Sequence, residues 1–427
     1  LVVSYETWLG KSKEPRKNLI GSIISQDELN AMGRDAAVKF LQDHAANAKA
    51  SAAQKDSKYQ YSGELTVYNL RYDSLAANGF TLAIFDEAHK LKTPSSKLHE
   101  SVVKFAGPPS PDQSNGIILS TGSPVDTRPE DAYGLIRLMN PKIYPSQRSF
   151  DYEHCVLLPG VKFRKVLRYQ NMEGLHHNLY SCARRITKRA AFPDMPDRVV
   201  TEISVTLSPE HREAYTRMVD EQLAVLGDTV TVASQQQAFM YMQQSLLNPG
   251  LLTDEDVDNK VLEAIDTLLE QLDGQKVLMY CWFRESVNIL TSRYEKLNPV
   301  TIHGGSSAKD RDNAKKRFIE DETCGLMIAN PVSGGVGIDG LQAVSSYIVF
   351  AEIIPWPGKF EQAVGRLERS GQTEAVNLYL IVPKRTIAVK LRNDLCRKEA
   401  DVNKVVRDKK TLMSDLLGEE GIQGTVK

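Results

Sequence analysis

The stretch TLAIFDEAH, residues 81–89, sets an apolar run directly before two acids, Asp86 and Glu87. An apolar run of this length is typical of a strand buried on both faces of a parallel sheet. Helical patterns, such as residues 309–320 (KDRDNAKKRFIE), lie between further runs of the same kind. Those runs occupy residues 116–120, 276–283, 325–330, 346–351 and 376–382. Strands that alternate with helices predict an α/β fold.

The expected strands form two clusters, which predicts two α/β lobes with a helical insert between them. A length of 427 residues also indicates two or three domains, because one hydrophobic core seldom serves so long a chain. Residues 45–57 (AANAKASAAQKDS) are expected to form a flexible or weakly helical insertion. The expected divisions are lobe 1 at 1–150, the insert with a basic patch at 151–260, lobe 2 at 261–390 and a charged helical segment at 391–427.

The composition excludes several classes of protein. With 41% hydrophobic and 25% charged residues, the chain is typical of soluble globular proteins. No apolar run approaches the roughly 18 residues that cross a bilayer, so no membrane partner is expected. Five scattered cysteines without a CxxC pair argue against a zinc site or a disulfide framework. The net charge of −1 by itself gives no sign of a nucleic-acid partner.

The charge is nevertheless uneven along the chain. Residues 160–189 carry eight Lys or Arg against one acid, Glu173. Basic side chains in such a patch can contact nucleic-acid phosphates, although a charge cluster can equally tie parts of the fold together. The candidates for phosphate contacts are Arg164, Arg168, Arg184, Arg185 and Lys188.

Asp86 and Glu87 suggest metal-assisted phosphate chemistry. A carboxylate at the end of a buried strand can hold Mg²⁺ on the phosphates of a nucleotide, and a second can orient the attacking water. His89 completes the DEAH motif and joins them as a candidate catalytic residue. The alternative is a strand end capped by two acids, because a match of four residues is common.

Residues 362–372 (QAVGRLERSGQ) contain Arg366 and Arg369, which would share one face of a helix because they are three positions apart. Two guanidiniums on one face can reach a γ-phosphate and stabilise the charge of its transition state. A solvated basic face is the alternative for an isolated pair. The position of the pair after the second strand cluster favours the phosphate role.

Two glycine-bearing turns follow expected strands. Residues 120–124 (STGSP) would place small residues where the two lobes are expected to meet, and Ser120, Thr121 and Gly122 are the candidates for coupling between the motifs. Residues 333–339 (SGGVGID) contain glycines that allow close approach to a phosphate or a DNA strand. Either turn by itself is more typical of an ordinary loop.

In this order, the motifs resemble the motor of superfamily-2 helicases of the Swi/Snf type, over residues 64–395. The DEAH segment is similar to motif II, residues 120–124 to motif III, and residues 362–372, with their trailing Ser-Gly-Gln, to the Swi/Snf form of motif VI. Residues 348–358 (IVFAEIIPWPG) are similar to the subgroup that includes the annealing helicases, and a phage or bacterial source is expected. Other similar segments are residues 182–188 (CARRITK), 246–249 (LLNP), 276–283 and 303–305 (HGG).

The resemblance implies two RecA-like lobes, ATP and Mg²⁺ as cofactors, and Asp86 as the Mg²⁺ ligand. It implies an ATP hydrolase that translocates on double-stranded or branched DNA and reanneals or remodels what it meets. Partners would be replication, repair or defence proteins in the cytoplasm or nucleoid, or in a eukaryotic nucleus. The remaining candidate contacts are Gln362, Gly335, Gly337 and Asp339 for the nucleotide, and His303, Gly304, Ser333, Gly334 and Trp356 for DNA.

The sequence departs from the family pattern at several positions. Glu368 stands where the family usually has His, and Ser123 where it usually has Thr. A phosphate loop needs GxxxxGK[ST], but the Gly-Lys-Ser at residues 10–12 has Tyr5 at the first glycine position. The phosphate loop is therefore expected upstream of Leu1, and this chain alone is expected to show no DNA-stimulated ATPase activity.

Two alternatives to a DNA motor stay open. The first is a nucleotide-dead pseudo-motor that only binds DNA or a protein partner. The intact acids and both arginines argue against it, because a dead site has no chemical need for them. The second is a superfamily-2 RNA helicase, which Trp356-Pro357 and the trailing Ser-Gly-Gln disfavour.

Overall fold

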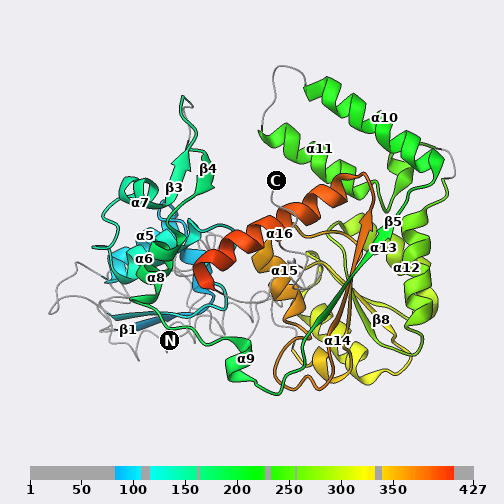
Figure 1. The fold of residues 1–427 in the computed structure, drawn as a ribbon. Helices are drawn as coiled ribbons and strands as arrows, with labels where there is room; N and C mark the ends of the chain where they lie inside the picture. Colours follow the sequence, from blue (N-terminus) through cyan, green and yellow to red (C-terminus); the bar gives the residue numbers. More distant parts are fainter. Residues whose placement is uncertain are drawn as a thin grey trace, which may run out of the picture. The chain divides into compact units, whose positions relative to one another are not determined.

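The computed structural model describes residues 82–106, 116–160, 164–226, 232–254, 257–331 and 339–407. These residues belong to two compact units. Figure 1 shows the fold, coloured from blue at the N-terminus to red at the C-terminus. The first unit comprises the described residues up to Pro124 together with Glu130–Cys182. The second unit comprises Val125–Pro129 and the chain from Ala183 onward. Within the described part of the chain, no helix is long and apolar enough to cross a membrane. The sequence around residues 10–12 and the insertion expected at 45–57 lie outside the described residues.

The second unit is built on a six-stranded sheet in which all neighbouring strands are parallel, in the order β5-β10-β9-β6-β8-β7. The prediction of an α/β fold with a parallel sheet is confirmed. Four apolar runs predicted as strands are confirmed as β6, β8, β9 and β10, and every residue of β6 and β8 is buried. The strands are β5 (Val199–Val205), β6 (Val277–Tyr280), β7 (Val300–Ile302), β8 (Leu326–Ala329), β9 (Tyr347–Phe350) and β10 (Asn377–Pro383).

Two strands of this sheet lie where the sequence predicts none. Both β5 and β7 are at edges of the sheet, so neither carries the continuous apolar run of a central strand. β5 mixes exposed with half-buried residues, and β7 is only three residues long. β5 therefore belongs to the second unit, although its residues fall within the span expected for a helical insert.

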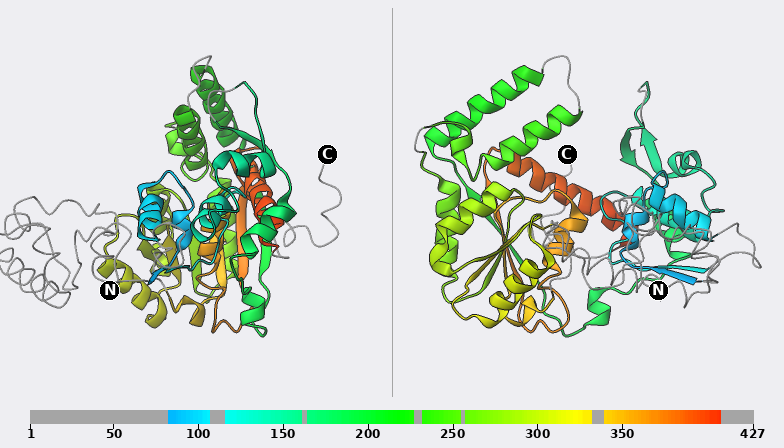
Figure 2. Two further views of the ribbon diagram at one scale, coloured as in Figure 1. Left: turned by 90° about the vertical axis from the view of Figure 1, so that its left-hand side faces the viewer. Right: turned by 180° about the vertical axis from the view of Figure 1, so that it is seen from behind.

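Helices pack around this sheet and close its hydrophobic core. The helical stretches expected at 208–226, 234–247 and 309–320 are confirmed as α10, α11 and α14. Figure 1 and Figure 2 show α10 and α11 lying side by side. The helices are α9 (Lys188–Ala191), α10 (Pro209–Leu226), α11 (Val232–Gln244), α12 (Lys260–Gln271), α13 (Arg284–Arg293), α14 (Ala308–Glu320), α15 (Pro357–Val364) and α16 (Ile387–Val406), with 3-10 turns η2 (Pro249–Leu251), η3 (Glu295–Leu297) and η4 (Leu341–Ala343).

The first unit contains a parallel pair of strands, β1 (Leu82–Phe85) and β2 (Gly116–Leu119), which confirms the first two predicted strands. The prediction that the first of them is buried on both faces is wrong, because Leu82 is 52% and Ile84 is 67% exposed in a sheet of two strands. An antiparallel hairpin of β3 (Cys155–Leu157) and β4 (Val166–Tyr169) follows later in the chain. The helical elements are η1 (Ala88–Leu91), α5 (Lys97–Ala106), α6 (Asp131–Met139), α7 (Gln147–His154) and α8 (Met172–Tyr180). Phe85, Leu91 and Phe105 are among the buried residues of its core.

The first unit extends to Cys182, past the boundary expected at residue 150. Buried polar and aromatic contacts hold the later elements to α6. The ring centroids of Tyr133 and Phe150 are 5.2 Å apart, and Tyr144 Oη lies 2.6 Å from His154 Nε2. Asn178 in α8 donates a hydrogen bond of 2.8 Å to the same hydroxyl. These contacts join α7, β3 and α8 to the first unit. A boundary drawn from sequence composition could not detect them, because they link residues that are distant in the chain.

Candidate active site and nucleic-acid contacts

Asp86 and Glu87 directly follow β1, and both residues are exposed. Glu87 has a left-handed backbone, with φ of 51° and ψ of 44°, and its N–H donates to Asp86 Oδ1 over 2.9 Å. For a residue other than glycine, this conformation costs about 1–3 kcal/mol, and such strain clusters at functional sites. The turn therefore presents two carboxylates at the carboxyl end of a parallel strand, where ligands of α/β sheets bind.

The acidic pair fits the Mg²⁺ role assigned to Asp86. Carboxylate oxygens are hard ligands, and Mg²⁺ is usually bound by one or two of them together with water and substrate phosphates. Within the described ranges, no group of three or more His, Cys, Asp or Glu could hold a metal ion.

The segment expected to couple the motifs lies next to the acids within the first unit. Ser120 N–H donates to Phe85 O over 2.8 Å, and Ala88 N–H donates to Ser120 O over 2.9 Å. The buried ring of His89 lies with Nδ1 3.3 Å from Thr121 Oγ1 and 3.1 Å from Glu87 Oε2. Since β1 and β2 are parallel neighbours, their carboxyl ends bring the two motifs together. A Cβ added at Gly122 would meet nothing within 4 Å, so packing does not require glycine there.

The two arginines belong to the second unit, and the helix expected to carry them ends too early. α15 stops at Val364, with Gly365 as its C-cap, so both arginines lie in the turns that follow. The expectation that they share a helix face is therefore wrong. They converge instead on Asp339: Arg366 NH1 lies 3.7 Å from Asp339 Oδ1, and Arg369 NH1 donates to the same oxygen.

The proposed nucleotide contacts are only partly within the described residues. Asp339 is 63% exposed at its side chain and is held by the two arginines. Gln362 is half-buried, and its Oε1 accepts a hydrogen bond of 3.3 Å from Lys359 Nζ. Gly335 and Gly337, predicted to approach the nucleotide, and Ser333 and Gly334, predicted to approach DNA, lie outside the described residues.

Several members of the predicted basic patch are held by ion pairs or hydrogen bonds within the fold, including the exposed Arg164 and Lys188. Arg164 donates to Asp151 Oδ1 over 2.7 Å and to Glu130 Oε2 over 2.8 Å. In the second unit, Arg185 NH1 donates to Val406 O at the end of α16, over 2.9 Å. Two further members of the patch, Arg168 on β4 and Arg184, are exposed. The phosphate contacts stay predictions, and these exposed arginines are the members best placed to make them.

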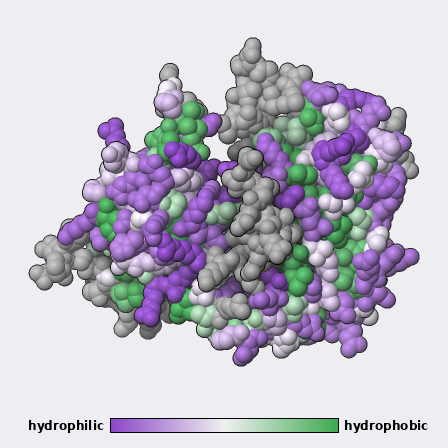
Figure 3. Space-filling model, viewed as in Figure 1, coloured by the Kyte–Doolittle hydropathy of each residue, from purple (hydrophilic) through white to green (hydrophobic). Residues whose placement is uncertain are grey.

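The hairpin that carries Arg168 also exposes apolar side chains. Leu157 is 38% exposed and Leu167 is 54% exposed. Figure 3 shows hydrophobic colouring gathered over this part of the first unit. Arg164, in the connection between β3 and β4, donates to Asp151 of α7 and so ties the hairpin to that helix.

The remaining DNA candidates lie in the second unit at or beyond the ends of strands. His303 follows β7, and its Nδ1 accepts the N–H of Gly305 over 3.1 Å, while Gly304 is exposed. Trp356 is the N-cap of α15 and is 38% exposed. Its ring centroid lies 4.7 Å from that of Trp282, with an angle of 34° between the rings. Trp282 is not among the residues predicted to contact DNA, because its contact with Trp356 joins two segments that are distant in the sequence.

Comparison with known proteins identifies the family. Residues 52–261 match the SNF2-related domain, and residues 260–371 match the helicase conserved C-terminal domain. The chain belongs to the SNF2 family. A Mycoplasma genitalium protein described as an uncharacterized ATP-dependent helicase is 24% identical over 345 residues, and the match covers 79% of this chain and 31% of that protein.

Further SNF2 relatives include chromatin remodellers. The CHD3-type chromatin-remodeling factor CHR7 of Arabidopsis thaliana is 25% identical over 347 residues, which are 76% of this chain and 27% of that protein. The chain thus spans less than a third of the length of either relative. Among solved structures, the Sulfolobus solfataricus SWI2/SNF2 ATPase core in complex with dsDNA has a TM-score of 0.38 and 19% identity, and the match covers 80% of this chain and 77% of that one.

One departure from the SNF2 motif pattern has a structural counterpart. Glu368, at the position where the family usually has His, accepts a hydrogen bond of 2.7 Å from Lys188. Arg198 NH1 lies 3.9 Å from the same carboxylate and donates to Glu361 over 2.9 Å. Lys188 and Arg198 therefore tie residues before β5 to motif VI. Sequence reasoning missed this cluster because its pairs are 180 and 163 residues apart in the chain.

Proposed function

We propose that this SNF2-family protein hydrolyses ATP to move along double-stranded DNA and to remodel or reanneal what it meets. Asp86 holds Mg²⁺ on the phosphates, and Glu87 orients the attacking water. Arg366 and Arg369 stabilise the charge that develops on the transferred phosphoryl group. ATP supplies the free energy, and residues of both units are required for its hydrolysis.

One observation carries this proposal most directly. The strained turn that presents Asp86 and Glu87 is bonded through His89 to Thr121, in the segment after the neighbouring strand. A displacement of that segment would alter the position of the His89 ring, and with it the Glu87 carboxylate 3.1 Å away. Hydrolysis and movement can be coupled through such a contact, because a shift of the segment at Thr121 changes the geometry at Glu87.

Double-stranded DNA is the partner that the exposed groups favour. Arg168 and Arg184 offer guanidiniums for phosphate contacts, and Trp356 offers an exposed ring. Chromatin-remodelling relatives such as CHR7 support the same class of partner. The paired state of Arg164, Arg185 and Lys188 leaves fewer phosphate contacts than the charge count of the patch alone would predict.

The proposal is tested by measuring ATP hydrolysis by the intact protein with no nucleic acid, with duplex DNA and with duplex RNA of the same length. Movement is followed by displacement of a third strand from a DNA triplex. We expect stimulation by duplex DNA and ATP-dependent displacement. Stimulation by RNA alone would support an RNA helicase instead. DNA binding without hydrolysis would support the pseudo-motor.

A further inference from the structure

We infer that Trp282 and Trp356 form one paired aromatic contact to duplex DNA, and that Glu352 positions this pair. The inference rests on the proposed function, because DNA binding by the second unit is part of that proposal. The new assignments are that Trp282 contacts DNA and that Glu352 is a positioning residue, which holds the backbone at Trp282.

The three groups concerned meet at one edge of the sheet. The parallel strands β6, β8 and β9 are direct neighbours and end at Tyr280, Ala329 and Phe350. The residues just beyond those ends are Trp282, Asn330 and Glu352. The carboxyl edge of a parallel sheet is where α/β proteins bind ligands.

The peptide groups on either side of Trp282 are held from two neighbouring segments. The Trp282 N–H donates to Glu352 Oε2 over 2.5 Å, and the Trp282 carbonyl accepts from Asn330 Nδ2 over 2.5 Å. The Phe283 N–H donates to the same Glu352 oxygen over 3.1 Å, and Ser286 Oγ donates to Glu352 Oε1 over 2.5 Å. Glu352 is only 4% exposed. Its carboxyl group therefore fixes the backbone from which the Trp282 ring projects.

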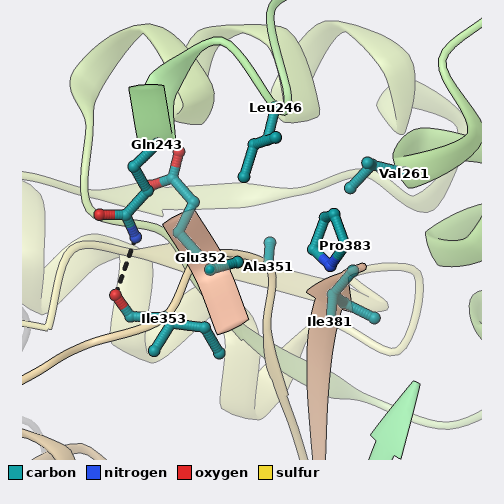
Figure 4. Close-up of a pocket in the computed structure, with 9 residues that line it drawn as sticks. Gln243, Leu246, Val261, Ala351, Glu352, Ile353, Ile381 and Pro383 are labelled. Atoms are coloured by element: carbon teal, nitrogen blue, oxygen red, sulfur yellow. Dashed lines mark hydrogen bonds between the residues drawn. The ribbon is translucent and has the colours of Figure 1, made fainter. Parts of the chain in front are cut away.

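The segment that leads from Glu352 to Trp356 is fixed as well. Figure 4 shows Gln243 pointing toward this segment, where its Nε2 donates to Ile353 O over 2.8 Å. Lys398 Nζ donates to Pro355 O over 2.8 Å. Both tryptophan rings thus start from anchored backbone, which keeps them in contact at a tilt of 34° while Trp356 stays 38% exposed.

A purely structural role explains these observations less well. Burial raises the pKa of Glu352 to about 7, so the carboxyl group is buried at a free-energy cost that an apolar residue would avoid. A tryptophan that served only the core would be covered, whereas Trp356 is 38% exposed. Aromatic rings held in place can contact the sugars and groove edges of a duplex with little loss of conformational entropy.

The first test uses the 427-residue chain carrying Trp8→Phe, which leaves Trp282 and Trp356 as its tryptophans. We expect duplex DNA to change their fluorescence, and Trp282→Ala to weaken duplex binding about tenfold. Tyr347→Ala is the matched control, because Tyr347 is a half-buried aromatic at the opposite end of β9. It should leave duplex affinity unchanged. Duplex binding by Trp282→Ala as tight as that of the parent would overturn the inference.

The second test separates positioning by Glu352 from general stability. In Glu352→Gln, the amide oxygen can accept both N–H groups and the amide nitrogen can donate to Ser286, so affinity should be retained. Glu352→Ala should weaken duplex binding by the folded protein about as much as Trp282→Ala does. A role in stability alone would lower the melting temperature and leave the affinity of folded protein unchanged.

If Glu352→Ala does not fold, Asn330→Ala is used instead. It removes the hydrogen bond to the Trp282 carbonyl, and it should weaken duplex binding in the same way. Parent-like affinity of a folded Glu352→Ala or Asn330→Ala variant would overturn the positioning role. A parent chain that does not bind duplex DNA at all would instead contradict the proposed function. The two failures are thus distinguishable.

Discussion

At the scale of single residues, the acidic turn after β1 shows how a strand end becomes a chemical site. Glu87 is held in a left-handed conformation by a hydrogen bond to Asp86 and by contact with His89. Its carboxylate is exposed and is thereby available to a water molecule. The conformational strain is maintained because Ala88, the next residue, is bonded to the neighbouring strand end at Ser120.

We expect Glu87→Gln in the intact protein to abolish DNA-stimulated ATP hydrolysis while ATP and DNA binding stay nearly intact. Glutamine keeps the shape of the side chain but cannot orient or accept a proton from water in the same way. Steady-state hydrolysis and nucleotide titration measure the two properties separately. Glu100→Gln, an exposed acid on α5 of the same unit, is the control. Wild-type turnover in Glu87→Gln would remove Glu87 from the mechanism.

Arg366 and Arg369 are predicted to act on the transition state, so alanine at either position should lower kcat by about 10³ or more. Nucleotide binding should weaken far less, because the charge they stabilise develops only during transfer. Single-turnover rates and nucleotide dissociation constants are the measurements. Arg397→Ala is the control, since that side chain is 67% exposed and belongs to a surface ion pair. Equal losses in rate and binding would indicate a structural role within the Asp339 cluster.

At the scale of elements, the β3–β4 hairpin carries two arginines with different surroundings. Arg164 is bound by Asp151 and Glu130, whereas Arg168 is exposed on β4. Burial alone would raise the pKa of Asp151, but hydrogen bonding from Arg164 brings it below its usual value. The pairing therefore stabilises the hairpin, while the neighbouring arginine keeps its charge at the surface.

This difference predicts opposite outcomes for two similar substitutions. Arg168→Ala should reduce the slope of log affinity for duplex DNA against log salt by about 0.9, with little change in stability. Arg164→Ala should leave the slope unchanged and lower the melting temperature, because Asp151 loses its partner. Salt titrations and thermal unfolding measure both effects. A reduced slope in stable Arg164→Ala would favour the phosphate contact predicted from the sequence.

At the scale of the whole molecule, buried titratable groups in both units link stability to pH. Burial lowers the pKa of His99, His154 and His211 below the ordinary value of 6.5. Below pH 6.5 the unfolded chain therefore binds protons that the folded chain does not, and stability falls. Glu352 acts in the opposite direction, because burial raises its pKa in the folded protein to about 7, above the ordinary 4.5. Between those pH values the folded chain binds a proton that the unfolded chain does not, so this group stabilises the fold as pH falls.

Because the three histidines act in the same direction, we expect the melting temperature to fall as pH is lowered from 7.5 to 5.5. Glu352→Gln removes the opposing contribution and should make the fall steeper. Thermal unfolding at constant ionic strength measures both profiles. Parallel profiles for the parent and Glu352→Gln would contradict the assigned ionisation of Glu352, and a flat parent profile would contradict that of the histidines.

Much of the fold and of the acidic site could be predicted from residue order. The apolar runs of β6, β8, β9 and β10 were recognisable because central parallel strands are covered on both faces. The contact of His89 with Thr121 was not predicted, although it follows from two neighbouring parallel strands ending at one edge. The edge strands β5 and β7 escaped prediction, because an edge strand needs no continuous apolar run.

The sequence by itself thus determined the α/β class, the SNF2-type motif order and the acids at a strand end. Only the tertiary structure decided which charges are paired: Arg164 with Asp151, Lys188 with Glu368, and the motif VI arginines with Asp339. It also decided that Trp282 meets Trp356 and that Glu352 holds the turn beneath them. The physical reason is that burial patterns are local in sequence, whereas ion pairs, buried carboxyl groups and ring–ring contacts depend on segments that only folding brings together.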